Sequence, residues 1–273
     1  MGIILGGNNL SGTNFNALGE IPTTPSVITE GLVLWLDAGI LDSFINTSAN
    51  YYDCGYGYQY YASNPGCVAA NTKWFDISGN GADGVFTNGV SISYNNSGGA
   101  MVFDGTNDYV NIPTFNNQPT SQITCEAWIN PTEPISTGTV RGGVISATNT
   151  MYLGIFNSVD GGSTHSLHWA NTTNSSRPYS YDGNIPNNTW SHIVGTWDGS
   201  TSRAYVNNTQ VWSAAQSGTI ASATYVVGTY GGGLTDGTHN FQGQIAIARV
   251  YNRALSVSEI LNNYNNGRAR FGI

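Results

Sequence analysis

The strongest constraint on the fold is a series of short strand-like segments, each separated from the next by residues that favour turns. About a dozen segments follow one another at spacings of roughly 8–12 residues, and nearly every gap contains Gly, Asn, Asp, Ser or Pro. Segments such as DYVNIP, ITCEAWINP and WSHIVGTW have the length and the β-branched or aromatic content of strands. We therefore predict an all-β fold of two antiparallel sheets, a jelly-roll sandwich.

Local signals predict two hairpins and one helix. Asp198-Gly199 and Asn207-Asn208 separate strand-like segments and tolerate the backbone angles of tight hairpin turns. Near the C-terminus, Ser256 followed three residues later by Glu259 forms a capping-box pattern. Gly267 is expected to stand just after the last helical residue, which gives one short C-terminal helix of about two to three turns.

The chain divides into an N-terminal arm and one domain. Residues 1–28 are rich in Gly, Asn and Thr and show no periodicity, so we predict an arm or attachment segment. Residues 29–273 form the predicted jelly-roll domain, with a Tyr-rich loop insertion at about 41–73. The N-terminus lacks a basic region and no apolar run reaches about 18 residues, so neither a secretory signal nor a membrane span is expected.

Low charge excludes two classes of partner. Only 9% of the residues are charged, the formal net charge is -8, and lysine occurs once, at Lys73. Binding of nucleic acid through phosphates needs a basic surface, and so does attraction to an anionic membrane. We therefore expect neither partner, whereas the 12% of aromatic residues supplies material for a core and for binding.

The three cysteines have different expected roles. Cys54 and Cys67 lie in one Tyr- and Gly-rich stretch and could close a short loop as a disulfide, or remain thiols, depending on the compartment. Cys125 lies in the strand-like ITCEAWI and is expected to be a small buried hydrophobic residue.

Six segments, in this order, resemble the laminin-G-like, concanavalin-A-like jelly-roll family: GLVLWLDA, WFDISGNGADG, AMVFDGTNDYVNIP, CEAWINP, NTWSHIVGTWDGSTSRAYVNN and GQIAIARVYNRALSVSEI. The resemblance spans about Thr29 to Asn266. More narrowly, PSVITEGLVLWLDA leading to SGNG and then SGGAMVFDGTNDYV is similar to the version in structural proteins of tailed bacteriophages. Those proteins commonly begin with a short arm that carries no signal.

The resemblance implies a non-enzymatic virion structural protein, either a capsid decoration or a tail fibre or adhesin, made in the host cytoplasm. Residues 1–28 would attach it to other virion proteins, and the domain would be displayed as a homo-oligomer able to bind host-surface glycans. The alternative is an extracellular carbohydrate-binding module of a bacterial surface or secreted protein. Relatives usually carry an acidic pair in the penultimate strand, where this chain has Ala246 and Ile247. A metal site that depends on that pair would be lost or moved.

No catalytic residue is predicted. Glycosidases need two carboxylates at a set separation, and relatives that cut glycans carry closely spaced acids such as E-x-D-x-x-E. None of the five Glu residues has such neighbours, and the nucleophile motif G-x-S-x-G is absent. We expect no enzyme and no required cofactor.

Two turns carry oxygen ligands that suit calcium. FDGTNDY places Asp104 and Asp108 in one tight turn, and we predict a structural calcium site there, with ordinary hairpin chemistry as the alternative. DISGNG begins like an EF-hand loop at Asp76, but Thr87 stands where the bidentate Glu is required, so an EF-hand is excluded. This second segment is either a turn or a calcium loop completed from elsewhere.

Aromatic residues in polar loops are the best binding candidates, because sugars stack on exposed rings. A glycan platform is predicted from Trp169, Tyr179, Tyr181 and Tyr230. The tyrosines of the loop insertion are predicted to contact protein, since Tyr is enriched at interfaces: Tyr51, Tyr52, Tyr56, Tyr58, Tyr60 and Tyr61. The alternative for these loop tyrosines is a contact with sugar, and the simplest alternative is that the rings pack on the sheets.

Overall fold

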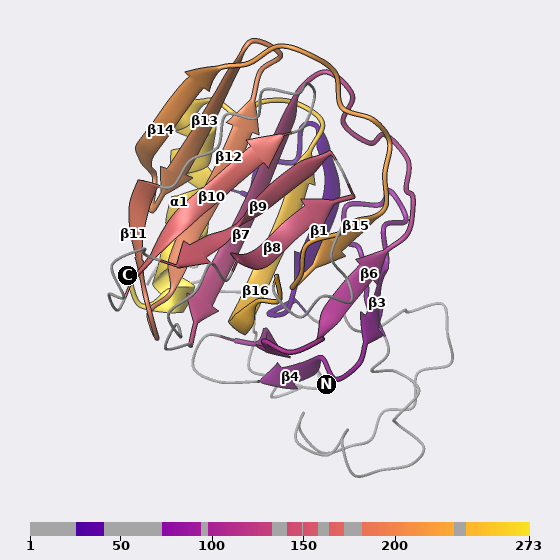
Figure 1. Cartoon of the computed structure of the whole chain (residues 1–273), viewed down its shortest axis with the longest axis vertical. Coiled ribbons are helices and arrows are strands. Elements are labelled where there is room, and N and C mark those ends of the chain that lie inside the picture. The colour runs from indigo at the N-terminus through magenta and orange to yellow at the C-terminus, as the bar shows by residue number, and fades with distance from the viewer. Residues whose placement is uncertain are drawn as a thin grey trace, which may run out of the picture.

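The computed structural model describes residues 26–40, 73–93, 98–132, 141–148, 150–157, 164–171, 182–231 and 239–273. Within these ranges the chain forms two antiparallel sheets followed by one helix, α1 (Val257–Phe271) (Figure 1). The predicted jelly-roll class with a C-terminal helix is therefore confirmed. No helix in this part of the chain is long and apolar enough to cross a membrane.

In the described part of the chain, each sheet contains eight strands. The path of sheet A is β14 (Thr209–Ala215), β13 (Thr201–Val206), β12 (Ser191–Trp197), β7 (Ile123–Pro131), β16 (Gln242–Tyr251), β5 (Ala100–Asp104) and β4 (Ser91–Ser93), while β1 (Leu32–Asp37) pairs with β16 off this path. The path of sheet B is β11 (Asp182–Pro186), β10 (Thr164–Asn171), β9 (Met151–Asn157), β8 (Arg141–Ala147), β15 (Tyr225–Val227), β6 (Tyr109–Ile112), β3 (Gly84–Thr87) and β2 (Lys73–Trp74). Strands distant in sequence, such as β7 and β16, are neighbours because the chain crosses between the sheets.

The core fills the space between the two sheets. Successive side chains of a strand point to opposite faces, so each strand sends alternate residues inward. Sheet A contributes Cys125 and Ile129 of β7, and sheet B contributes Leu153 and Ile155 of β9. Cys125 is fully buried, as predicted, and burial raises the pKa of its thiol well above the usual value.

Both predicted hairpin turns are confirmed. The β12–β13 turn is held by Asp198, whose carboxylate accepts hydrogen bonds from the backbone N–H groups of Ser200 and Thr201 at 2.9 and 2.7 Å. The β13–β14 turn has φ of 46° at Asn207 and 63° at Asn208, the left-handed pair that a type I′ turn requires. These short connections fix the register of three adjacent strands in sheet A.

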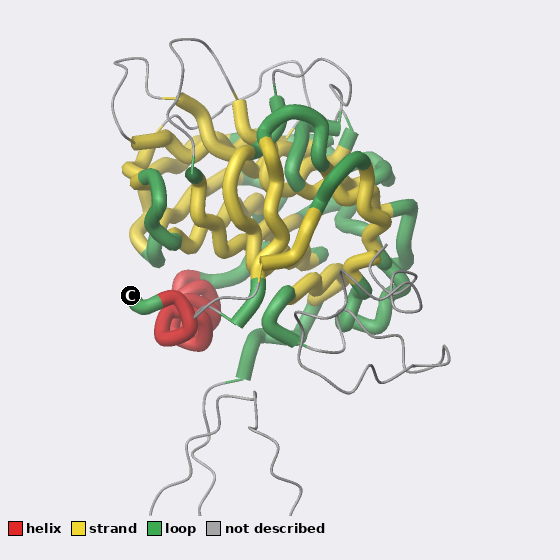
Figure 2. The backbone as a smooth tube through the Cα atoms, turned by 90° about the horizontal axis from the view of Figure 1, so that it is seen from below, coloured by secondary structure: helices red, strands yellow, loops and turns green. Residues whose placement is uncertain are grey.

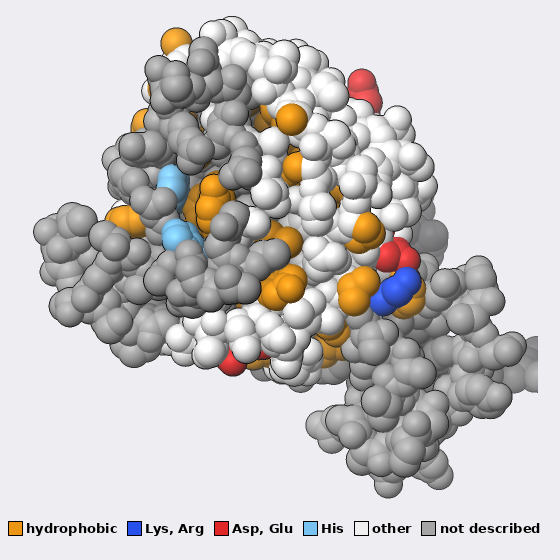
Figure 3. Space-filling model, turned by 45° about the vertical axis from the view of Figure 1, so that its right-hand side comes forward, with side chains coloured by type: hydrophobic (Ala, Val, Ile, Leu, Met, Phe, Trp, Pro, Cys, Tyr) orange, Lys and Arg blue, Asp and Glu red, His pale blue; other side chains and the backbone are white. Residues whose placement is uncertain are grey.

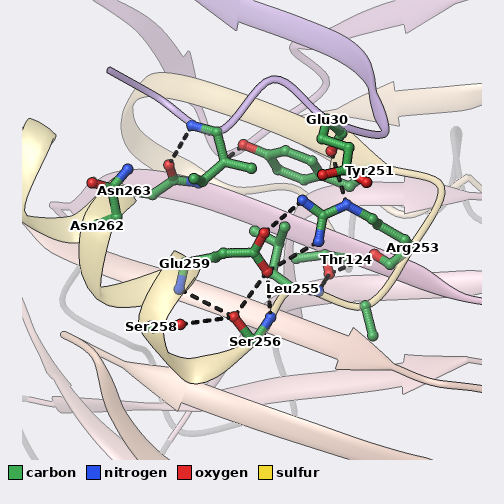
Figure 4. Close-up of polar contacts among 12 residues, drawn as sticks. Glu30, Thr124, Tyr251, Arg253, Leu255, Ser256, Ser258, Glu259, Asn262 and Asn263 are labelled. Atoms are coloured by element: carbon green, nitrogen blue, oxygen red, sulfur yellow. Dashed lines mark hydrogen bonds and ion pairs between the residues drawn. The ribbon is translucent and has the colours of Figure 1, made fainter. Parts of the chain in front are cut away.

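The N-terminal end of α1 is capped as predicted. The Ser256 side chain accepts from the Glu259 backbone N–H, and the Glu259 carboxylate accepts from the Ser256 N–H at 2.8 Å (Figure 4). Arg253 adds two charged hydrogen bonds to Glu259, at 3.0 and 2.7 Å. These contacts satisfy backbone donors that the first helical turn would otherwise leave unpaired.

The predicted end of the helix at Gly267 is wrong. The helix continues to Phe271, and Gly272 takes the left-handed cap with φ of 75°. Gly267 instead lies inside the helix against the indole of Trp128, where a Cβ would come within 2.6 Å of the ring. Glycine is required there by a tertiary contact and not by the end of the helix.

Helix α1 covers the outer face of sheet A (Figure 2). Beneath it lies the buried carboxylate of Glu126, which accepts from Arg249 at 2.6 Å and from the Asn263 side chain at 2.7 Å. The Asn263 amide also donates to the Tyr251 hydroxyl at 2.9 Å. A buried carboxylate is costly unless it is fully paired, so this network ties α1 to the sheet.

The first described residues are also attached to α1. The backbone N–H of Ile28 donates to the Asn263 side chain at 3.0 Å, and Asn262 donates to the Ser26 carbonyl at 2.9 Å (Figure 4 shows Asn262 and Asn263). Residues 26–28, which were assigned to the arm, therefore contact the domain, and the rest of the arm lies outside the described residues.

Candidate functional site

The outer face of sheet B carries a cluster of aromatic and histidine side chains, which we call the aromatic–histidine cluster. Its members come from β9, from β10 and from the described segments that follow β15 and precede β16: Tyr152, Phe156, His168, Tyr230 and His239. Strand alternation explains the set, because Leu153 and Ile155 of β9 point into the core and leave Tyr152 and Phe156 on the other face.

The rings contact one another in a continuous chain. The centroid of His168 lies 4.7 Å from Tyr152 and 6.2 Å from Phe156. Tyr152 in turn lies 5.4 Å from Tyr230, and Tyr230 lies 5.4 Å from His239. These are the tilted and edge-on separations that aromatic pairs prefer, so each ring orients the next.

Gly154 makes room for the Tyr152 ring. It lies between the two outward aromatic residues of β9 and pairs with His168 on β10. A Cβ at this position would come within 2.6 Å of the Tyr152 hydroxyl and the ring carbon that carries it. The missing side chain therefore lets the tyrosine lie flat over the strand, toward His168.

A polar frame holds the segment that carries Tyr230. The Ser146 hydroxyl on β8 donates to the Thr229 carbonyl at 2.8 Å and accepts from the Gly231 N–H at 2.9 Å. Both bonds are buried, and they bracket Tyr230 from either side. The Thr229 hydroxyl donates to the side chain of Asn240 at 2.7 Å, next to His239. The residues on both sides of Tyr230 and the residue next to His239 are thus held by hydrogen bonds from neighbouring side chains.

Histidine and hydrophobic side chains are visible next to one another on one side of the molecule (Figure 3). Tyr152, Phe156 and His168 are buried, whereas Tyr230 and His239 are half-buried and present part of their rings. No member of the cluster is a carboxylate or a permanently charged residue. Chemically, the surface offers ring faces, a phenol and imidazoles, which suit stacking and hydrogen bonding with neutral polar ligands.

The predicted glycan platform is corrected at one position. Trp169 is fully buried in the core, its indole N–H donates to Ser202 at 2.7 Å, and it packs against Gly195 of the opposite sheet. It points inward because β10 places Leu167 and Trp169 on the core face. Trp169 therefore cannot stack on a sugar at the surface, whereas Tyr230 lies in the cluster.

Several predicted residues lie outside the described ranges. These are Tyr179 and Tyr181 of the platform, the tyrosines at 51, 52, 56, 58, 60 and 61, and the pair Cys54 and Cys67. Their assignments remain predictions.

Sequence reasoning missed four members of the cluster: Tyr152, Phe156, His168 and His239. The alternation in MYLGIFN was the available signal, since it puts Tyr152 and Phe156 on one face. His165 and His168 lie on different faces of β10, because they are three positions apart in a strand. His165 is buried on the other side with its ring 2.5 Å from the Asn187 side chain, and burial lowers the pKa of this histidine.

The predicted calcium ligands lie in a tight turn between β5 and β6. Asp104 accepts backbone hydrogen bonds from Thr106 and Asn107 at 2.7 and 3.3 Å. Asp108 is buried, accepts from the Asp104 N–H at 3.1 Å, and has a pKa raised mainly by loss of solvent. Among the described residues no group of three or more His, Cys, Asp or Glu side chains gathers as a metal site. Calcium at Asp104 and Asp108 remains a prediction, which calorimetric titration after chelation decides.

The DISGNG segment forms a hydrogen-bonded turn against β1. Asp76 accepts from the backbone N–H groups of Trp35, Ser78 and Ala82 at 2.9 to 3.1 Å. Ile77 donates to the Trp35 carbonyl at 3.0 Å. The carboxylate of Asp76 thus serves to attach the turn to the free side of β1. Ala246 and Ile247, which replace the acidic pair of relatives, are buried beneath α1.

Comparison with known proteins agrees with this architecture. Residues 104–261 match the family described as the concanavalin A-like lectin/glucanases superfamily. No curated protein sequence matches the chain.

Among solved structures, the binding domain of Paraclostridial Mosquitocidal Protein 1 is similar with a TM-score of 0.61 at 15% identity, over 86% of this chain and 52% of that one. Domain 4 of AbnA, an extracellular arabinanase from Geobacillus stearothermophilus, in complex with arabinotriose, has a TM-score of 0.51 at 18% identity, over 69% and 91%. Trypanosoma rangeli sialidase has a TM-score of 0.56 at 15% identity, over 94% and 36%. The chain thus spans about half the length of the mosquitocidal binding domain. At these identities the likenesses show a shared fold.

Proposed function

Because the chain belongs to the concanavalin A-like lectin/glucanases superfamily, we propose that it is a non-enzymatic glycan-binding protein displayed on a bacteriophage particle. The observation that carries the glycan part is the aromatic–histidine cluster on the outer face of sheet B. It is a set of contacting rings without a carboxylate, Lys or Arg, on the face of the sandwich opposite α1, where Tyr230 and His239 present part of their rings. The ligand class that fits is a neutral glycan.

Ring geometry supports stacking with sugar C–H faces. Tyr230 and His239 present part of their rings, while Tyr152 and His168 lie behind them and hold the pair in place. Because Ser146 fixes the backbone on both sides of Tyr230, little conformational entropy would be lost on binding. A preorganised platform of this kind binds without a large movement of the domain.

The described carboxylates support a role without catalysis. Glu126 is buried in an ion network, Glu259 caps α1, and Asp76 holds a turn. Asp104 and Asp198 likewise accept backbone hydrogen bonds in their own turns. Glycoside hydrolysis needs two carboxylates facing one bond, and these side chains are distributed over separate structural roles.

Two observations support display on a particle. The sequence resembles the version of this fold in tailed-bacteriophage structural proteins, and residues 1–28 are the predicted attachment arm. Ser26 and Ile28 are held on α1, which lies on the face opposite the aromatic–histidine cluster. Attachment to other virion proteins through the arm would leave the cluster facing outward. The location proposed is therefore the virion.

A glycan array followed by titration of the best hit tests the binding role. The Tyr230→Ala variant should weaken binding at least tenfold, because it removes the half-exposed ring. Tyr109→Ala is the matched control, since Tyr109 is a half-buried tyrosine on the same face, on β6. Equal loss in both variants, or no glycan bound by the parent protein, would contradict the proposal.

A second candidate is an extracellular carbohydrate-binding module of a bacterial surface or secreted protein. The fold likeness to domain 4 of the arabinanase, of which this chain covers 91%, favours it. A mass-spectrometric inventory of purified phage particles separates the two. Presence of this chain in stoichiometric amount supports the virion assignment, and its absence from particles supports the module.

A further inference from the structure

The edges of the two sheets differ in how they are protected. An edge strand exposes backbone N–H and C=O groups that can pair with another chain, and proteins usually blunt such edges by short length, charge, proline or a covering loop. Sheet A ends at β14 and β4, and sheet B ends at β11 and β2. The free side of β1 forms an additional edge in sheet A.

Four of these five edges carry such protection. β4 has 3 residues and β2 has 2, one of which is Lys73. β11 contains Asp182 at its start and Pro186 at its end. β1 is bonded along its free side by the DISGNG turn, through Asp76 and Ile77. None of these edges offers an open strand of useful length.

β14 is the least protected of the five edges among the described strands. It has 7 residues, Thr209–Ala215, with neither a charged residue nor a proline. It pairs with β13 on one side and ends the sheet on the other (Figure 1 shows it at the margin of the molecule). A β-bulge at Val211 protects the first half of the strand, after which Trp212 to Ala215 pair regularly with Ala204 to Thr201. Along this last part no other described strand pairs with the outer side of β14.

The distribution of charge along the sequence favours a second copy of this chain as the partner of the β14 edge. The protein carries a formal net charge of -8, so two copies repel one another over most of their surface. From Ala204 to Thr235, however, the sequence contains no Asp, Glu, Lys or Arg. The small exposed side chains of Ser213 and Ala215 also allow close approach of a second backbone. The β14 edge of a second copy can therefore approach this edge without like-charge repulsion between the two strands.

We propose that β14 is a dimer interface, at which a second copy of this chain adds its own β14 antiparallel to the first. A twofold axis makes the two strands antiparallel, so one self-complementary patch serves both copies. Sheet A then continues across the pair. The interface lies at the edge of sheet A, so the partner copy does not cover the aromatic–histidine cluster of either copy. This proposal stands independently of the glycan role.

Sedimentation velocity on the full chain over a wide concentration range tests the proposal. The expected species at high concentration has about twice the chain mass of 29.0 kDa. Ser213→Lys should give a monomer, because the two new charges would face each other across the axis. Val257→Lys is the matched control, an equally solvent-facing position on α1 that should leave the dimer intact.

Three outcomes would overturn the proposal: a monomeric parent protein, a dimer that survives Ser213→Lys, or loss of the dimer in Val257→Lys as well. Hydrogen exchange provides a measurement that does not depend on a variant. Amides of Trp212 to Ala215 should exchange more slowly in concentrated than in dilute protein, and the hairpin turn at Asn207 should not change. Equal exchange at both concentrations would also overturn it.

Discussion

Glu126 and Asn263 are 137 positions apart in the sequence and are joined by a hydrogen bond of 2.7 Å inside the protein. One belongs to β7 in the middle of sheet A and the other to the buried side of α1. The same asparagine accepts from the backbone of Ile28, so a single side chain connects sheet, helix and N-terminal segment. The helix is thus a structural part of the sandwich.

Replacing Asn263 should destabilise the domain. In Asn263→Ala, the buried Glu126 carboxylate loses a charged hydrogen bond, and the free energy of unfolding should fall by about 2–3 kcal/mol. Denaturant unfolding monitored by tryptophan fluorescence measures the change. Asn265→Ala, at an exposed position on the same helix, should change stability by less than about 0.5 kcal/mol. Equal effects of the two variants would argue against the network.

Acid should weaken the fold through Glu126. Burial by itself raises the pKa of this carboxyl, but the Arg249 guanidinium, the His192 ring 3.5 Å away and the hydrogen bond from Asn263 outweigh it and lower the pKa to about 2. A depressed pKa in the folded state stabilises above the ordinary value near 4.5, and this stabilisation is lost as pH falls from 4.5 toward 2. The loss corresponds to roughly 3 kcal/mol.

Thermal unfolding at a series of pH values measures this dependence. The Glu126→Gln variant should be less stable at neutral pH and should show a flatter profile below pH 4.5. Glu259 also has a pKa lowered to about 2, chiefly by its hydrogen bond from Arg253, so Glu259→Gln is the necessary comparison. If both variants keep the parent profile, the acid sensitivity arises elsewhere.

The variant Gly267→Ala should have a higher helix propensity but a worse packing against Trp128. Alanine is favoured over glycine in a helix by about 1 kcal/mol. The added Cβ, however, would stand within 2.6 Å of the Trp128 ring, and overpacking of this kind costs about 1–3 kcal/mol. We expect the clash to prevail and the melting temperature to fall, with altered Trp128 fluorescence. A higher melting temperature would show that Trp128 can shift without cost.

Removing residues 1–25 should separate folding from attachment. Ser26 to Ile28 are retained because Asn262 and Asn263 bind them, so the melting temperature should stay unchanged. Incorporation into phage particles should be lost, as measured by immunoblotting of purified virions. Particles that still contain the truncated protein would show that the arm does not attach it.

Local signals were sufficient for much of the fold. The capping box at Ser256 and the turn at Asn207-Asn208 were predictable because each depends on residues within four positions. The end of the helix was not predictable, since glycine is needed at position 267 to avoid a clash with Trp128, which is 139 positions away in the chain. A glycine that fits a tertiary contact looks the same in sequence as one that ends a helix.

The candidate site was predictable only in part for the same reason. Tyr230 stood out as an aromatic residue in a polar loop, but its neighbour Tyr152, and His168 behind that ring, come from strands β9 and β10 of sheet B. The face that each strand turns outward depends on register, and a shift of one residue exchanges Trp169 with His168. The alternation in β10 alone left that choice open, and the core settled it in favour of Trp169.

The attachment of Ser26 to Asn262 determines where the two ends of the domain lie. Asn262 and the end of α1 at Phe271 are separated by about nine residues of helix, or roughly 14 Å along its axis, so both ends leave the sandwich on the α1 side (Figure 2). A domain with neighbouring ends can be inserted into a surface loop of another protein without disturbing its host. Residues 26–273 are thus a natural cassette for grafting, with sheet B turned away from whatever carries it.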